Sequence, residues 1–327
     1  MKKIAITGAN GYLASLIQAS NEHKVEFVPV TRRDVDFSQP EAVTRFFENL
    51  EFDAVFHTAA LSQTADCEAH PLVAHKINTE SAINIAKICQ QKKAQFIFLS
   101  TEQVFNNRSD QEPYTENTPV NSASVYGKQK IEVETFLIEN QINAIILRLS
   151  WMMGLSYPGI KSSPNLIKNV MNAMLYQKPT KFTVNEIRGI TYAKNLAEQF
   201  DKIVNLPKGV YHFSSKNVFT TYEAAKHIGA ALGFEKAVIE QLILPDHQRY
   251  TDRFRNLRLA TNKIQAQGIE ISTFEEDIDN CLTDFDWKKQ KTSNRKGFLL
   301  FHSRNFSNNL ISSCKYLFAI VNRIMIL

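Results

Sequence analysis

Tyr126 and Lys130 combine residue types and a spacing that suit proton transfer. They lie four residues apart in a predicted helix that begins near Ser124, so their side chains are expected on one helix face. An ammonium beside a phenol favours the phenolate and lowers the phenol pKa. The pair therefore predicts a tyrosine tuned to exchange a proton near neutral pH.

The sequence context selects this pair from others with the same spacing, Tyr157/Lys161 and Tyr222/Lys226. Only Tyr126 and Lys130 follow a predicted strand, 95–99, that ends in the hydroxyl residues Ser100 and Thr101. This arrangement suits hydride reduction of a carbonyl group by a nicotinamide cofactor. Thr101 would donate a hydrogen bond to the carbonyl oxygen as charge develops there, and Tyr126 would supply the proton.

A glycine turn at the start of the chain predicts where such a cofactor binds. Gly8, Gly11 and Ala14 follow a short apolar strand, 4–6, and open a helix at Tyr12. Without Cβ atoms, the first two positions allow a sharp turn and let a pyrophosphate approach the helix N-terminus. The alternative is an ordinary strand–helix turn that uses glycine only for its geometry.

Two arginines favour NADP(H) over NAD(H), which stays possible. Arg32 and Arg33 follow the second predicted strand, 25–30, whose end faces the adenosine ribose in dinucleotide folds. Their guanidinium groups could pair with a 2′-phosphate. In the alternative they are solvated loop residues, and Asp34 neutralises one of them.

Strands and helices alternate along the first half of the chain. Strands are predicted at 4–6, 25–30, 52–58, 95–99 and 142–149. The predicted helices between them begin at residue 12, cover residues 41–48 and 72–92, and begin near residue 124. Ser38 and Glu41 are expected to form a capping box. His57 lies inside an apolar strand and is expected to be a packed structural residue. The alternation predicts an α/β fold, a Rossmann-type doubly wound parallel sheet.

The alternation weakens after residue 152. We predict three parts: a dinucleotide-binding domain at 1–151, a smaller substrate-binding region intertwined with it at 152–287, and a tail at 288–327. Helices are expected at 165–176, 195–204 and 221–232, and strands at 180–185 and 209–213.

Charge is distributed unevenly between the tail and the rest of the chain. Residues 288–327 hold eight Lys and Arg residues and no Asp or Glu, so this segment carries a charge of +8. Because the whole chain has a net charge of +5, residues 1–287 carry −3. This balance does not suggest nucleic-acid binding. The basic, then apolar, tail could contact an anionic membrane surface. A docking helix, or an extension without a role, is the alternative.

Cysteine usage and the N-terminal residues predict a cytoplasmic protein. Cys67, Cys89, Cys281 and Cys314 are scattered without metal-ligand spacing, which is typical of reduced thiols and predicts no metal site. No secretory leader is expected, because only a short apolar run precedes the glycine turn. A homodimer stays possible.

The chain resembles the extended short-chain dehydrogenase/reductase superfamily and, within it, most of all the dTDP-4-dehydrorhamnose reductase family. The resemblance covers about residues 1–285. It is carried by Thr-Gly-Ala-Asn-Gly-Tyr-Leu-Ala at 7–14, Asp-Phe-Ser-Gln-Pro-Glu at 36–41, Thr-Ala-Ala-Leu-Ser at 58–62, Ser-Thr-Glu-Gln-Val-Phe at 100–105, Ser-Val-Tyr-Gly-Lys-Gln-Lys at 124–130, Leu-Arg-Leu-Ser-Trp at 147–151, Gly-Ile-Thr-Tyr at 189–192 and Arg-Phe-Arg-Asn-Leu-Arg-Leu at 253–259.

The resemblance implies a set of site residues. Thr101, Tyr126 and Lys130 would form the catalytic triad, and Thr101, Glu102 and Trp151 would contact the deoxysugar. The resemblance also implies that the cofactor is lined by Asn10, Gly11, Tyr12, Asp36, Phe37, Ala60, Leu61 and Ser62. The glycine turn, the two arginines and the Tyr/Lys pair add Gly8, Leu13, Arg32, Arg33, Tyr126 and Lys130 to the predicted cofactor-binding residues. The family reduces the 4-keto group of a dTDP-linked 6-deoxysugar in dTDP-L-rhamnose biosynthesis.

Departures from the family pattern lie mainly on the substrate side. Glu102 and Gln103 replace Asp-Tyr, Ile190 stands where the family has proline, and Phe254 and Leu257 replace Pro and Ser. These changes favour reduction of a related nucleotide sugar over rhamnose itself. Two alternatives stay open. One is a non-catalytic regulatory subunit like the methionine adenosyltransferase beta subunit, which resembles the same family, and the other is a nucleotide-sugar epimerase.

Overall fold

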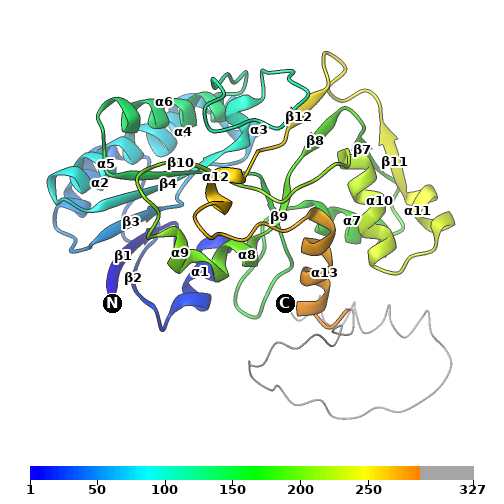
Figure 1. Ribbon diagram of the computed structural model, residues 1–327, viewed down its shortest axis with the longest axis horizontal. Helices are drawn as coiled ribbons and strands as arrows, with labels where there is room; N and C mark the ends of the chain where they lie inside the picture. The colour runs from blue at the N-terminus through cyan, green and yellow to red at the C-terminus, as the bar shows by residue number, and fades with distance from the viewer. Residues whose placement is uncertain (288–327) are drawn as a thin grey trace, which may run out of the picture.

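The computed structural model describes residues 1–287, which are built around one parallel sheet of six strands (Figure 1). Its strands are β1 (Lys2–Thr7), β2 (Val25–Val30), β3 (Ala54–His57), β4 (Gln95–Thr101), β5 (Ala144–Leu149) and β10 (Gly209–Phe213). They lie in the order β10-β5-β4-β3-β1-β2. The order reverses at β1, so the carboxyl ends of β1 and β3 border the position where such sheets bind ligands.

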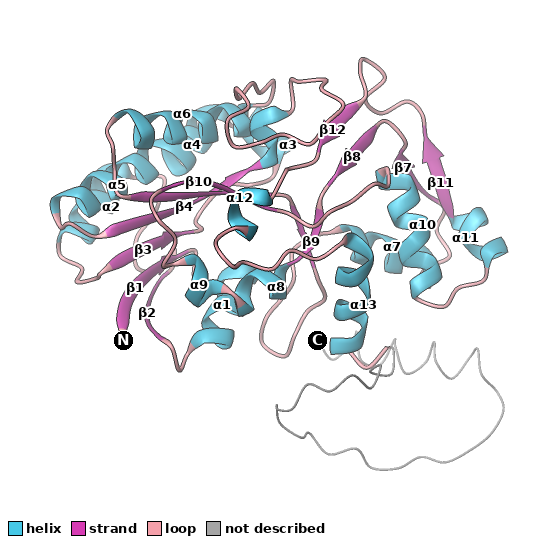
Figure 2. Cartoon of the chain, viewed as in Figure 1, coloured by secondary structure: helices cyan, strands magenta, loops and turns pink. Residues whose placement is uncertain are grey.

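Helices cover both faces of this sheet, as Figure 2 shows. One face carries α1 (Tyr12–Asn21), α8 (Ala193–Glu198) and α9 (Phe200–Ile203), and the other carries α2 (Pro40–Glu48), α5 (Ser81–Gln91) and α6 (Val125–Glu139). Ile4 and Ile6 pack on the first face and Ala5 on the second, because successive strand residues point to opposite sides. The predicted doubly wound Rossmann-type fold is confirmed.

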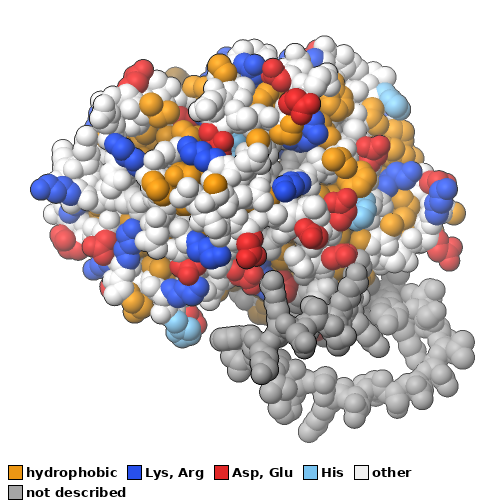
Figure 3. Space-filling view, viewed as in Figure 1, with side chains coloured by type: hydrophobic (Ala, Val, Ile, Leu, Met, Phe, Trp, Pro, Cys, Tyr) orange, Lys and Arg blue, Asp and Glu red, His pale blue; other side chains and the backbone are white. Residues whose placement is uncertain are grey.

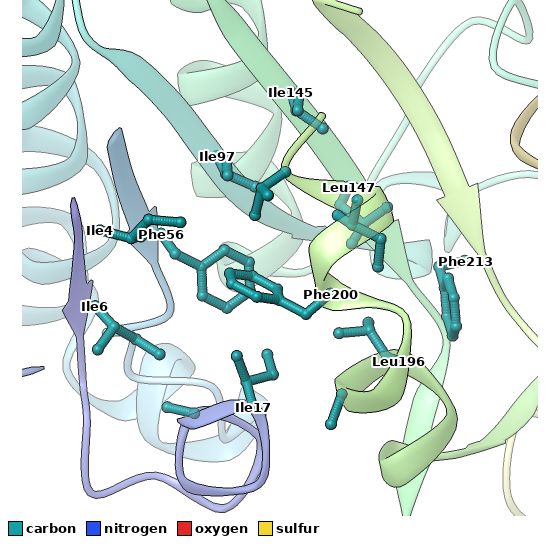
Figure 4. Packing of buried hydrophobic residues seen from close by; sticks show 14 of the residues in the cluster. Ile4, Ile6, Ile17, Phe56, Ile97, Ile145, Leu147, Leu196, Phe200 and Phe213 are labelled. Carbon is teal, nitrogen blue, oxygen red and sulfur yellow. The ribbon is translucent and has the colours of Figure 1, made fainter. Parts of the chain in front are cut away.

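The core on the α1 face joins segments that are far apart in the chain. Figure 4 shows Phe200 of α9 beside Phe56 of β3, and their ring centroids lie 4.9 Å apart in an edge-on arrangement. Ile17 of α1 and Leu196 of α8 belong to the same buried cluster. The predicted helix 195–204 is thus two short helices, α8 and α9, packed against the first helix of the chain.

The predicted helix 72–92 is present but not uniform. It consists of α4 (Pro71–His75), a π-helical turn (Lys76–Glu80) and α5, and α3 (Thr64–Ala69) precedes it. A π turn inside a helix shifts the side chains that follow it. This turn carries Asn78, whose contacts are described with the site.

A second region contains three two-stranded parallel ladders. They pair β6 (Trp151–Met153) with β9 (Ile190–Tyr192), β7 (Thr180–Thr183) with β11 (Ile243–Asp246), and β8 (Glu186–Arg188) with β12 (Arg255–Leu257). The helices of this region are α7 (Leu166–Leu175), α10 (Thr221–Ala231), α11 (Lys236–Leu242) and α13 (Phe274–Asp284), whereas α12 (Asn262–Gln265) packs on the main sheet beside β10. Between β9 and α10 the chain returns to the main sheet through α8, α9 and β10. The boundary at 151–152 stays a prediction.

The capping box expected at Ser38 and Glu41 is wrong. The N-cap of α2 is Gln39, without a side-chain cap, and Pro40 occupies the first turn. The Asp36 carboxylate accepts a hydrogen bond from the Ser38 backbone N–H at 2.8 Å. This Asx-type turn makes Ser38 part of the loop before the helix. Capping boxes occur instead at α10 and α13, with Thr220/Glu223 and Thr273/Glu276.

The described residues contain no helix long and apolar enough to cross a membrane. Within residues 1–287, no group of three or more His, Cys, Asp or Glu side chains could hold a metal ion. Acidic and basic side chains are interspersed over the described part of the face in Figure 3. The predicted membrane contact of residues 288–327 lies outside the described residues.

Candidate active site

Tyr126 and Lys130 lie together on the first two turns of α6. The Lys130 Nζ atom is 5.7 Å from the centroid of the Tyr126 ring and 4.5 Å from that of Phe98. Lys130 is only 2% exposed, and its ammonium donates a hydrogen bond to the Leu99 carbonyl at 2.8 Å. The lysine is therefore fixed against the end of β4, two residues before Thr101.

A glycine allows α6 to approach the turn that follows Thr101. A Cβ atom at Gly127 would lie 2.0 Å from Ser122 Oγ and 2.6 Å from the Gln103 carbonyl oxygen. Thr101 Oγ1 accepts a hydrogen bond from the Gln103 backbone N–H at 3.2 Å, which leaves its O–H as a donor. The structure thus brings Thr101, Tyr126 and Lys130 to one place.

Burial sets the protonation states of the pair. Desolvation lowers the pKa of Lys130 to about 8, against the opposing effects of Glu134 and Cys67. Burial raises the pKa of the Tyr126 phenol, and the nearby Cys67 thiol adds to this rise. The direction for Tyr126 is opposite to the one the lysine spacing predicts, because burial disfavours the charged phenolate. Tyr126 is therefore a protonated phenol at neutral pH, the form a proton donor needs.

The glycine turn after β1 has the geometry of an anion cradle. Gly8 has φ +61°, and a Cβ atom there would lie 3.0 Å from Thr58 Oγ1. Gly11 is the N-cap of α1 and provides no side-chain cap, so the first-turn N–H groups of this ten-residue helix stay available to an anion. Asn10 is exposed, whereas Tyr12 is buried and donates to the Leu155 carbonyl at 3.0 Å.

Hydrogen bonds lock the end of β3 to β1. Thr7 Oγ1 accepts hydrogen bonds from the backbone N–H groups of Thr58 and Ala59, both at 3.0 Å, and lies 3.0 Å from His57 Nδ1. His57 is 1% exposed, and burial, with a smaller effect of Lys130, lowers its pKa to about 3. It is a neutral core residue, as its apolar strand predicts.

Asn78 holds the segment 60–62 that follows β3. Its Oδ1 accepts from the Leu61 backbone N–H at 2.8 Å, and its Nδ2 donates to the Leu61 carbonyl at 3.0 Å. The same Nδ2 donates to Gln129 of α6 at 2.8 Å. Sequence reasoning missed this role, because the π turn that aims Asn78 inward has no sequence signature. Ala60 and Leu61 are half-buried and Ser62 is exposed.

The two arginines after β2 are exposed and make no ion pair within the described residues. The Asp34 carboxylate accepts two hydrogen bonds at 2.8 Å from the backbone and hydroxyl of Thr31, which lower its pKa, and the charge of nearby Arg33 lowers it further. Partial neutralisation of Arg33 by Asp34 stays an alternative. Asp36 is exposed and ionised, since hydrogen bonds from Ser38 lower its pKa. Phe37 is buried in the core and presents only its backbone to this edge.

The substrate-side residues are joined by an ion pair. Glu102 is 1% exposed, and its carboxylate accepts a hydrogen bond from Arg188. The Arg188 guanidinium carbon lies 5.1 Å from the ring centroid of half-buried Trp151. The Glu102 carboxylate is thus already shared with an arginine, and its contact with a substrate hydroxyl stays a prediction.

Burial lowers the pKa of Arg188 to about 10, with smaller contributions from the nearby Arg249 and Arg255 charges. These three residues and Arg253, which donates to the Asn106 carbonyl, are called the arginine cluster. The β8–β12 ladder aligns Arg255 with Glu186, and Arg255 lies 3.6 Å from the Tyr250 ring centroid. The Nε–H groups of Arg188, Arg253 and Arg255 are buried and have no hydrogen-bond partner within residues 1–287. Sequence reasoning noted the 253–259 segment but assigned these arginines no role, because no local pattern reveals the β8–β12 pairing.

Known proteins are similar to this chain over nearly all of its described residues. The model of a family described as "RmlD substrate binding domain" matches residues 1–287. The spore coat polysaccharide biosynthesis protein SpsK of Bacillus subtilis is 28% identical over 285 residues, with 87% of this chain and 98% of the relative covered. Methionine adenosyltransferase 2 subunit beta of Bos taurus is 25% identical over 308 residues, with 88% and 90% covered. The solved structure of dTDP-4-dehydrorhamnose reductase from Bacillus anthracis in complex with NADP has a TM-score of 0.76 at 23% identity, with 87% of this chain and 99% of that chain covered.

Proposed function

The chain belongs to the RmlD substrate binding domain family, and on that premise we propose that it is an NADP(H)-preferring reductase of a nucleotide-linked 4-keto-6-deoxysugar. NAD(H) is the alternative cofactor. The observation that carries the proposal is the grouping of Thr101, Tyr126 and Lys130 at the end of β4. The reaction would be of the dTDP-4-dehydrorhamnose reductase type.

The residues of the chain fit a dinucleotide. The positive φ of Gly8 and the close approach of Thr58 favour glycine at this turn, and the uncapped N-terminus of α1 offers N–H groups to a pyrophosphate. Arg32 and Arg33 are free to pair with a 2′-phosphate, and Lys130 would hold the nicotinamide ribose. When bound, the nicotinamide supplies the hydride.

Residues of this chain would stabilise the charge on the substrate carbonyl oxygen and supply its proton. Thr101 would donate its hydroxyl hydrogen to the substrate carbonyl oxygen, where negative charge develops. The Tyr126 phenol, kept protonated by burial, would transfer its proton to that oxygen. The Lys130 ammonium, fixed on the Leu99 carbonyl, would stabilise the tyrosinate left behind.

The arginine cluster would bind the diphosphate of the nucleotide sugar. Three buried Nε–H groups without protein partners are donors that an anion can satisfy. Trp151, held beside Arg188, would provide an apolar surface for the deoxysugar ring.

Absorbance of the reduced nicotinamide tests the proposal. Purified protein would be mixed with NADPH, dTDP-4-keto-6-deoxyglucose and the corresponding 3,5-epimerase. Loss of absorbance that depends on this protein is the expected result. If absorbance persists while NADPH binding is shown separately, the substrate is a different keto sugar or the protein is not a reductase.

A regulatory subunit is a second candidate, supported by the likeness to methionine adenosyltransferase 2 subunit beta. Such a protein would bind the cofactor without oxidising it and would change the activity of a catalytic partner. A nucleotide-sugar epimerase would instead retain NAD tightly and consume no reduced cofactor. The unpaired Arg32 and Arg33 favour NADP and weigh against this third reading.

A further inference from the structure

Glu134 is a buried carboxylate on the catalytic helix that the proposed chemistry does not use. It lies one turn after Lys130 on α6 and is 2% exposed. Arg148 of β5 donates to it from Nε at 3.0 Å and from Nη2 at 2.6 Å. The hydroxyl of Ser100 on β4 donates to the same carboxylate. Helix α6 is therefore bonded through one side chain to both strands beneath it.

The network continues into β10 through His212. Arg148 Nη1 lies 3.3 Å from His212 Nε2, and His212 Nδ1 lies 3.1 Å from the Ala260 carbonyl. Because the arginine can only donate, Nε2 must be unprotonated and Nδ1 carries the hydrogen. Burial, and then the Arg148 charge, lower the pKa of His212 to about 3, which agrees with a neutral ring. Arg148 is thus held from two sides.

We propose that Glu134 is a positioning residue, whose carboxylate holds the Tyr126–Lys130 face of α6 in register with Thr101 at the end of β4. Ser100, which donates to Glu134, immediately precedes Thr101 in the chain. A displacement of α6 relative to β4 would separate the proton donor from the hydroxyl that binds the carbonyl oxygen. This inference rests on the proposed reductase function.

The charges around Lys130 predict in which direction its pKa changes when Glu134 is neutralised. The titratable groups that face its ammonium are Glu134 and Tyr126 on α6, Cys67 on α3 and His57 on β3. Burial keeps His57 neutral, and it raises the pKa of the Cys67 thiol and of the Tyr126 phenol. The Glu134 carboxylate, in contrast, favours the ammonium form of Lys130.

A titration of Lys130 tests this without requiring turnover. The protein would be labelled with ¹³C-lysine, and the Lys130 ¹³Cε resonance assigned by its loss in Lys130→Arg. In Glu134→Gln the midpoint of Lys130 should shift to lower pH. General loosening of the helix would shift it the other way, toward the value of an exposed lysine. An unchanged midpoint overturns the proposal, whereas a rise toward the value of an exposed lysine would show that α6 has moved away from β4.

Two further variants complete the test. Glu139→Gln makes the same chemical change on an exposed part of α6 and should leave the midpoint unchanged. If Glu134→Gln does not fold, the double variant Glu134→Gln/Arg148→Met removes the pair without leaving a buried unpaired charge, and it should also lower the midpoint.

Kinetics separate this inference from the reductase proposal. Once wild-type turnover is shown, Glu134→Gln should lower kcat about ten- to hundredfold, with the KM for NADPH nearly unchanged, since misplaced catalytic groups slow the chemical step. An unchanged kcat overturns the positioning role. If the wild type has no turnover, the reductase proposal fails, and the Lys130 titration still decides whether Glu134 acts on Lys130.

Discussion

The predicted cofactor edge and the predicted substrate side of this protein are built by different kinds of contact. At the cofactor edge, Gly8 and Gly11 belong to one short turn, and Gly11 donates its N–H to the Gly8 carbonyl at 2.7 Å. On the substrate side, Glu102 pairs with Arg188, which is 86 residues away in the chain. The ladder that carries Arg188 pairs β8 with β12, from a later segment.

Two departures from the family pattern, Glu102 and Leu257, lie in segments that are joined by long-range contacts. A local turn depends on a few backbone conformations, so its residue types are restricted and recognisable. An ion pair between distant segments can be replaced as a unit when both partners change. The substrate side can therefore vary while the cofactor edge stays the same, and the following experiments address the two regions separately.

The largest expected effect is on turnover, and it comes from the catalytic tyrosine and not from either binding region. Tyr126→Phe should lower turnover by about 10³-fold, since it removes the general acid, while NADPH affinity stays close to that of the wild type. Steady-state kinetics and cofactor-binding fluorescence would measure this. The matched control is Tyr222→Phe, which alters the tyrosine of another pair with the same spacing and should leave turnover unchanged. Substantial turnover in Tyr126→Phe would remove Tyr126 as the proton donor.

Substitutions on the predicted substrate side should lower the free energy of unfolding more than substitutions at the predicted cofactor edge. Arg188→Gln leaves Glu102 buried without its cation and should lower the free energy of unfolding by about 3 kcal/mol. The double variant Glu102→Gln/Arg188→Gln should recover part of this loss, because Glu102 is then neutral, although buried Glu186, which lies 3.7 Å from Arg188, still loses this cation. Urea unfolding measures both. Equal destabilisation by the single and double variants would contradict a coupled pair.

Substitutions at the predicted cofactor edge should change the affinity for the cofactor and leave the free energy of unfolding nearly unchanged. Replacing Arg32 and Arg33 by Ala should weaken NADPH binding about ten- to hundredfold and NADH binding much less, since only NADPH carries the 2′-phosphate. Calorimetric titration with both cofactors measures this. Arg45→Ala, an exposed arginine on α2, serves as the control. Equal effects on the two cofactors would reject the phosphate contact.

The smallest effect concerns pH. Lys130 is an ammonium below its pKa of about 8 and loses its charge above it. Because Tyr126 has a raised pKa and keeps its proton over this range, kcat/KM should fall as the pH rises through about 8, approaching tenfold per pH unit. A profile that stays flat well above pH 8 would show that the Lys130 charge is not required.

Much of the site was predictable because its signals are local. The four-residue spacing of Tyr126 and Lys130 puts them on one helix face in any α-helix, and the glycine turn follows from the backbone conformations it needs. The arginine cluster was not predictable, since the pairing of β8 with β12 leaves no periodic pattern. The Asn78 contact was missed for a related reason, because a π turn changes the direction of a side chain without a change in composition.

The sequence by itself determined the alternation of strands and helices, the turn at Gly8 and the shared face of Tyr126 and Lys130. These features depend on helix and strand periods and on turn geometry, which act over a few residues. Only the tertiary structure decided that Glu102 pairs with Arg188, that Glu134 joins α6 to β4 and β5, and that burial raises the pKa of Tyr126. Ion pairing and desolvation depend on which distant segments fold over a side chain, and the spacing of neighbouring residues carries no information about that.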